Sequence, residues 1–188
     1  MVPAEAKDHP ILSDLTDEFD CSRFDCREVE DDEEVNSFFR TQAAAEHDAG
    51  LNLTRVLRFR NDRRILGFVT LSMGQVTLKR DGLNIHPVGC VHIAYLGIQR
   101  EHKHKGWGTW LLAFAISEAV RLSSEIGCRG VGLHCRDGRR TWYEEHGFEW
   151  YGETEDSGGR LNKMFFDIRT EPITKPTDEE GAGPRGPA

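Results

Sequence analysis

The sequence has no long hydrophobic run and no paired cysteine motif, and each absence excludes a class of protein. No apolar stretch approaches the roughly 20 residues that cross a bilayer, and the polar start, Met1 to Asp8, is unlike a secretory signal. The five cysteines are scattered and form no CxxC pair, so neither a disulfide framework nor a metal site is expected. These absences favour a cytoplasmic protein with no membrane anchor and no bound metal.

Acidic and basic residues are distributed unevenly along the chain. Residues 1–36 contain 13 acidic and 3 basic side chains, whereas residues 37–150 contain 11 acidic and 16 basic ones. A basic middle suits an anionic cofactor or a nucleic acid, although an ordinary solvated surface would have the same composition. We expect an acidic lead-in over 1–22, a folded domain over 23–169 and a disordered tail over 170–188, which lacks apolar periodicity.

The apolar periodicity predicts one α/β domain. A helix is expected to begin in the acidic run 28–34 and to end near Gly50. The mostly apolar run 88–98 is typical of a central, buried strand, and a long amphipathic helix follows it to about Ile126, with Gly127 as its cap. The other predicted elements are strands at 54–60, 65–71, 75–79, 131–135, 148–152 and 163–168, of which the first two form an antiparallel hairpin, and a short helix at 139–146.

A basic loop with two glycines joins the central strand to the long helix. Lys103 and Lys105 supply positive charge, and Gly106 and Gly108 would let the backbone approach an anion without a Cβ in the way. Backbone N–H groups at a helix start bind phosphates, aided by the helix dipole. The loop therefore predicts a pyrophosphate site, although two glycines are also common at ordinary strand-to-helix turns. The glycine motifs of P-loop and dinucleotide-binding proteins are absent.

Two motifs in series resemble those of the GNAT acetyltransferase superfamily: Leu96-Gly97-Ile98 followed by Lys103-x-x-Gly106-x-Gly108, and Tyr143-x-x-x-Gly147-Phe148. The resemblance covers about residues 24–169. It departs from the family at Lys103, where Gln or Arg is usual. The resemblance implies an α/β (α+β) fold with a mixed, mostly antiparallel twisted sheet that is flanked by helices and splayed at its central strands.

The same resemblance implies acetyl-CoA as the co-substrate and indicates where it would bind. The backbone at the end of the central strand would pair with the pantetheine arm, and N–H groups of the loop would hold the pyrophosphate. The cofactor-binding residues implied in this way are Leu96, Gly97, Ile98, Lys103, His104, Lys105, Gly106, Trp107, Gly108 and Thr109.

Tyr143 and His92 are the catalytic candidates. Tyr143 matches the family tyrosine that protonates the departing CoA thiolate, a step that needs a nearby acid; simple packing of its ring on the sheet is the alternative. His92 precedes Ile98 by six residues, where some family members carry a glutamate base, and an ordinary pKa of about 6.5 suits that role. His134 is a second candidate base, and a core histidine or a chain of waters are the alternatives.

A narrower resemblance concerns the acceptor. Three segments resemble the GNAT branch that includes bacterial toxins acetylating aminoacyl-tRNA: Phe24-Asp25-Cys26, Asn36-x-Phe38-Phe39 with Ala43, and Leu66-Gly67-Phe68-Val69-Thr70-Leu71-Ser72. The first departs from the branch because Arg27 replaces a glycine. The branch implies tRNA as the acceptor and an antitoxin as the partner.

Three functions are consistent with the sequence. The first is an N-acetyltransferase acting on a primary amine of a small molecule or peptide; the second is a toxin-like enzyme that acetylates aminoacyl-tRNA; the third is a non-catalytic acyl-CoA-binding module. Tyr143 argues against the third. The acidic flank would compete with RNA phosphates, which favours the first function over the second. A homodimer is a further candidate assembly, and the acceptor amine itself is not identified.

Overall fold

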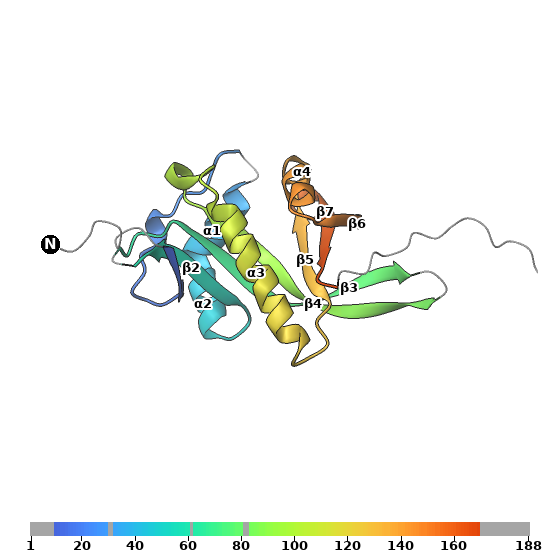
Figure 1. Ribbon diagram of the computed structural model, residues 1–188. Coiled ribbons are helices and arrows are strands. Elements are labelled where there is room, and N and C mark those ends of the chain that lie inside the picture. The colour runs from blue at the N-terminus through green and yellow to red at the C-terminus, as the bar shows by residue number, and fades with distance from the viewer. Residues whose placement is uncertain (1–9, 30–31, 61, 81–82, 170–188) are drawn as a thin grey trace, which may run out of the picture.

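The computed structural model describes residues 10–29, 32–60, 62–80 and 83–169, which form one mixed sheet with helices on both faces (Figure 1). Two short 3-10 helices are labelled η. In chain order the elements are β1 (Pro10–Asp14), η2 (Cys21–Arg23), α1 (Asp32–Thr41), α2 (Ala43–Asp48), β2 (Leu53–Phe59), β3 (Gly67–Arg80), β4 (Leu83–Ile98), η3 (Arg100–His102), α3 (Trp107–Ser123), β5 (Gly130–Cys135), α4 (Asp137–Glu145), β6 (Glu149–Asp156) and β7 (Gly159–Asp167). No helix within these ranges is long and apolar enough to span a membrane.

The strand order across the sheet is β1-β2-β3-β4-β5-β7-β6. Neighbouring strands are antiparallel except for β4 and β5, which are parallel. That parallel pairing covers only Val91–Ile93 against Val131–Leu133, and the two strands diverge beyond it. The predicted mixed, mostly antiparallel sheet with splayed central strands is therefore confirmed.

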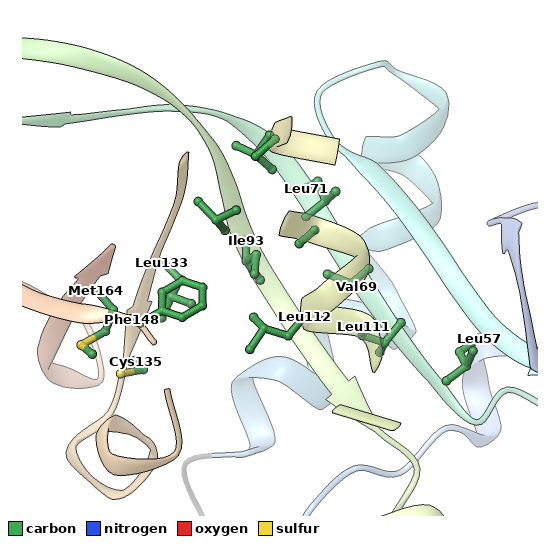
Figure 2. Close-up of a cluster of buried hydrophobic side chains, with 14 of the residues drawn as sticks. Leu57, Val69, Leu71, Ile93, Leu111, Leu112, Leu133, Cys135, Phe148 and Met164 are labelled. Carbon is green, nitrogen blue, oxygen red and sulfur yellow. The ribbon is translucent and has the colours of Figure 1, made fainter. Parts of the chain in front are cut away.

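Each face of the sheet has its own hydrophobic core. On one face, Leu111 and Leu112 of α3 pack against Val69 and Ile93 of the central strands (Figure 2). On the other face α1 and α2 cover the sheet, and the ring of Phe39 stacks on that of Phe68 with centroids 4.0 Å apart. Phe68 and Val69 point to opposite faces because side chains alternate along a strand.

Several element boundaries differ from those that the periodicity predicts. The helix expected to run to Gly50 is two helices, α1 and α2, separated at Gln42, whose backbone leaves the helical region. The long helix ends at Ser123, and Ser124 rather than Gly127 is its C-terminal cap. β1 lies within the segment expected to be an acidic lead-in. The sequence did not predict this strand, because five residues have too few alternations of apolar and polar side chains to be recognised. The Asp81-Gly82 turn and the tail 170–188 lie outside the described residues.

Candidate active site

The divergence of β4 and β5 opens a cleft of about 940 Å³. In Figure 1 the part of the molecule with α4 stands apart from the part with α1 and α3, above the point where the two strands meet. Among the ten residues predicted to bind the cofactor, all but Lys105 and Trp107 line this cleft. Tyr143, His92 and His134 line it as well. The fold thus brings together both sequence motifs and both candidate bases.

Lys105 and Trp107 point elsewhere. The Lys105 ammonium donates a hydrogen bond to the backbone oxygen of Glu101 at 2.9 Å and its side chain is exposed. The Trp107 ring packs against the main core, edge-on to Phe59 with centroids 6.2 Å apart. The Trp107 side chain therefore anchors the loop to the hydrophobic core and does not line the cleft.

The loop before α3 has the backbone of an anion cradle. His104 and Gly106 both lie in the left-handed region, with φ of 59° and 82°. Gly106 is the N-terminal cap of α3, and no side chain in the described part of the chain caps the first N–H groups of that helix. Uncapped N–H groups at the start of a 17-residue helix, after a loop with left-handed residues, suit a phosphate group.

The end of β4 offers a free backbone edge to the cleft. Leu96, Gly97 and Ile98 pair with β3 on one side, but β5 has already diverged on the other. An unpaired strand edge can accept an extended chain through its peptide groups. Glycine at 97 also has a packing reason, since a Cβ there would come within 2.6 Å of the Phe68 ring.

Carboxylates from the α1 end of the cleft pair with Lys103 of the loop and with Arg139 of α4. Lys103 pairs with Asp32 at 3.0 Å and with Glu28 at 3.2 Å, and His104 contacts Glu28 at 3.1 Å. Arg139 of α4 pairs with the same Asp32 at 2.9 Å. Burial alone would raise the pKa of Asp32, but hydrogen bonds from Lys103 and Arg139 hold that pKa below its usual value.

These acidic partners were missed by the sequence interpretation. It used the acidic run only to mark the start of a helix, whereas Asp32 and Glu28 also line the cleft. Asp32 lies 71 residues from Lys103 and 107 from Arg139 in the chain. Contacts over such separations leave no periodic signal that could have revealed them.

Tyr143 presents a protonated phenol to the cleft. Its ring lies against Trp142 and Phe148, with centroid distances of 4.8 Å and 5.6 Å. Its hydroxyl makes no hydrogen bond to any part of the chain that the structure describes. Burial raises the pKa of Tyr143 above its usual value, so the group keeps its proton at neutral pH. The hydroxyl is thus available to a bound ligand.

His92 and His134 lie side by side on β4 and β5, with ring centroids 5.2 Å apart. Burial, and then the neighbouring His134, lower the pKa of His92 to about 4. Burial and the nearby Lys163 also lower the pKa of His134. Both imidazoles are therefore neutral at pH 7, the state that a proton acceptor needs. Among the described residues, no cluster of three or more His, Cys, Asp or Glu side chains could hold a metal ion.

A model of the acetyltransferase (GNAT) family matches residues 12–148. The chain belongs to the GNAT family of acetyltransferases. It is an acetyl-CoA-dependent acyltransferase, and the co-substrate and fold class that the two motifs predicted are confirmed.

The proteins that this GNAT chain resembles include a tRNA-acetylating toxin. It is 28% identical to a tRNA-acetylating toxin of Mycobacterium tuberculosis over 123 residues, which span 61% of this chain and 72% of that protein. Its fold is similar to that of AtaT complexed with acetyl-methionyl-tRNAfMet, with a TM-score of 0.71, 26% identity and coverage of 85% of this chain and 95% of the other. It is also similar to a bacterial toxin with a TM-score of 0.73 at 18% identity, over 85% of this chain and 91% of the other. The predicted resemblance to the toxin branch is confirmed.

Proposed function

We propose that this GNAT enzyme transfers the acetyl group of acetyl-CoA to the α-amine of aminoacyl-tRNA. The observation that carries the proposal is the similarity to a tRNA-acetylating toxin over 72% of that protein's length. The likeness to AtaT complexed with acetyl-methionyl-tRNAfMet supports it. This acceptor replaces the small-molecule or peptide amine that the charge distribution of the sequence favoured. Aminoacyl-tRNA as the acceptor would also place the reaction in the cytoplasm.

The cleft suits acetyl-CoA in one orientation. The pyrophosphate would lie on the uncapped N–H groups at the start of α3, next to Gly106 and Gly108. The pantetheine arm would extend along the free edge of β4 from Ile98 to Leu96. This path leads from the cofactor loop into the cleft that Tyr143 lines.

In this arrangement Tyr143 would act as the general acid. The acceptor nitrogen attacks the thioester carbonyl carbon, the C–S bond breaks, and the phenol gives its proton to the departing sulfur. The raised pKa of Tyr143 keeps that proton in place until the thiolate forms. A positioned acid of this kind contributes roughly 10²- to 10⁴-fold to the rate.

His92 is the proposed base that removes the proton from the acceptor amine, with His134 as the alternative. Both line the cleft. The low pKa of His92, about 4, keeps it unprotonated but makes it a weak acceptor. A positioned base works best when its pKa lies near the working pH. We therefore expect substitution of His92 to slow the reaction less than substitution of Tyr143.

An antitoxin is a proposed partner on the ground of structural likeness. A mutant of the AtaT toxin has been solved bound to the C-terminus of the antitoxin AtaR and acetyl-CoA, and that structure matches this chain with a TM-score of 0.67 at 24% identity. At this identity the likeness alone shows the fold, and the partner is proposed because the toxin branch that the sequence resembles also implies an antitoxin.

One observation favours the second candidate, a small or peptidic amine. Arginines on the β2–β3 side of the sheet are paired with acids of the N-terminal segment: Arg55 with Asp14, and Arg63 with Glu18. Such pairs leave less charge for RNA phosphates. Exposed ion pairs are nonetheless weak, about 0–1 kcal/mol, so phosphates could replace the acids.

The proposal is tested by incubating the purified enzyme with labelled acetyl-CoA and either aminoacyl-tRNA or free amino acids and peptides. Label transferred to aminoacyl-tRNA, with a rate that falls steeply as salt is raised, is the expected result, because phosphate contacts are lost with ionic strength. The Tyr143→Phe variant is the matched control and should transfer little. Efficient transfer to peptides and none to aminoacyl-tRNA would favour the second candidate.

A further inference from the structure

We propose that Asp32 is a positioning residue: its carboxylate links the cofactor loop to the helix that carries Tyr143 and so sets the separation of the two walls of the cleft. The proposal rests on the proposed role of Tyr143 as the acid. It does not depend on the identity of the acceptor.

One carboxylate connects three elements. Asp32 is the first residue of α1, and one of its oxygens accepts a hydrogen bond from the Lys103 ammonium at 3.0 Å. Its other oxygen accepts one from the Arg139 guanidinium on α4 at 2.9 Å. The oxygen that binds Lys103 also accepts a hydrogen bond from the backbone N–H of Glu28 at 2.8 Å. The Asp32 and Lys103 side chains are only 14% and 15% exposed, so solvent screens their attraction weakly.

The sheet itself does little to fix the distance across the cleft. β4 and β5 are held together by only three residue pairs, and Lys103 follows β4 whereas Arg139 lies on α4, which follows β5. The two side chains therefore come from opposite walls, and Asp32 holds both. Further contacts among the described residues also join the two walls: Arg136 pairs with Glu34 of α1 at 3.3 Å, Thr109 of α3 contacts His146 just after α4 at 2.8 Å, and the ring of Trp142 lies near Gly108.

The link through Arg139 bears directly on Tyr143. The two residues are four apart on α4, so their side chains lie on the same face of the helix, one turn from each other. Holding Arg139 therefore fixes the rotation of the face that presents the phenol. A displacement of about 1 Å in a reacting group can cost roughly 100-fold in rate.

Neighbouring acids are not equivalent to Asp32. Glu28 is 39% exposed on its side chain and approaches Arg139 only to 3.9 Å. Glu33 pairs with Arg27 at 3.2 Å and does not line the cleft. Glu33 lies in the same first turn of α1, so it shares any interaction of Asp32 with the helix dipole. It is the matched control.

The test is a double-mutant cycle between Asp32→Asn and Tyr143→Phe, with Glu33→Gln as the control. Asp32→Asn should lower kcat by roughly 10- to 100-fold, because the acid is misplaced; the Kd for acetyl-CoA is measured alongside by calorimetry. Glu33→Gln should have normal kcat. In the Tyr143→Phe background the effect of Asp32→Asn on kcat should disappear, because a misplaced acid matters only while the acid is present.

Independent, multiplicative effects of the two substitutions would overturn the proposal, as would normal kcat in folded Asp32→Asn. Weaker binding of acetyl-CoA with unchanged kcat would overturn it too, since Asp32 would then serve cofactor binding and not the position of Tyr143. If Asp32→Asn does not fold, Arg139→Gln breaks the same link from α4 and is placed in the same cycle. Normal turnover of Tyr143→Phe alone would refute the proposed acid. If tRNA is not acetylated, a peptide amine is used as the acceptor in the cycle. A wrong acceptor can then be told apart from a wrong role for Asp32.

Discussion

Replacing Tyr143 with phenylalanine removes one oxygen atom from the cleft and leaves the packing of α4 intact. The ring contacts with Trp142 and Phe148, at 4.8 Å and 5.6 Å between centroids, do not involve the hydroxyl. The hydroxyl has no hydrogen-bond partner within the described chain, so its loss strands no buried group. We therefore expect the free energy of unfolding to change by no more than about 0.5 kcal/mol.

The effect on catalysis should be much larger. Loss of a positioned acid lowers kcat by roughly 10²- to 10⁴-fold, which corresponds to about 3 to 5 kcal/mol in the activation barrier. The Kd for acetyl-CoA should barely change, because the phosphate and pantetheine contacts proposed here come from β4 and α3. CoA release measured with a thiol reagent, calorimetry and urea unfolding would report the three quantities separately.

Near-normal kcat in a folded Tyr143→Phe variant would refute this reasoning and return Tyr143 to a packing role. A fall in kcat would also refute it if the free energy of unfolding fell by a similar number of kcal/mol. The expected signature is a large kinetic change with an unchanged urea midpoint.

Three further predictions follow from the described contacts. In Gly108→Val the new Cβ would lie 3.4 Å from the Trp142 ring, and the side chain would enter the cleft. The affinity for acetyl-CoA should fall roughly tenfold or more, as for one lost hydrogen bond to a charged group. The circular dichroism spectrum should not change. The pKa of His92 is lowered from 6.5 to about 4 by burial and by His134, so the folded state favours the neutral imidazole. The contribution of His92 to the free energy of unfolding is therefore fully present above pH 6.5 and is lost as the pH falls towards 4. His92→Asn should lose less stability than the wild type between pH 7 and pH 5 in urea unfolding, and an equal loss would contradict the assignment. Asp167→Ala removes a mostly buried carboxylate that accepts hydrogen bonds from Arg129 at 2.7 to 2.9 Å. The free energy of unfolding should fall by about 1.5 to 3 kcal/mol, as for a lost hydrogen bond to a charged group, and the Kd for acetyl-CoA should not change; a variant as stable as the wild type would show that the pair contributes little.

Local patterns made much of the fold predictable. The helix α3 and the strand before it carry their own periodicity and glycine signals, so their positions and the loop between them followed from neighbouring residues. β1 and the break between α1 and α2 did not, because a five-residue edge strand and a single non-helical residue at Gln42 give too little signal.

The candidate site was predictable in its backbone and less so in its side chains. Gly106 and Gly108 lie in the cleft, as expected from the loop motif, whereas Lys105 points away from it. Which way a loop side chain points depends on backbone rotation, here on left-handed His104. The role of Asp32 depends on partners 71 and 107 residues away, which only the folded chain brings together.

The most direct test of the central claim is mass spectrometry of the aminoacyl-adenosine released by ribonuclease from tRNA that has been treated with the enzyme and acetyl-CoA. The account predicts an acetyl group on the α-amine of the amino acid, present with the wild-type enzyme and nearly absent with Tyr143→Phe. An unmodified aminoacyl-adenosine, from an enzyme that acetylates peptide amines under the same conditions, would contradict the account.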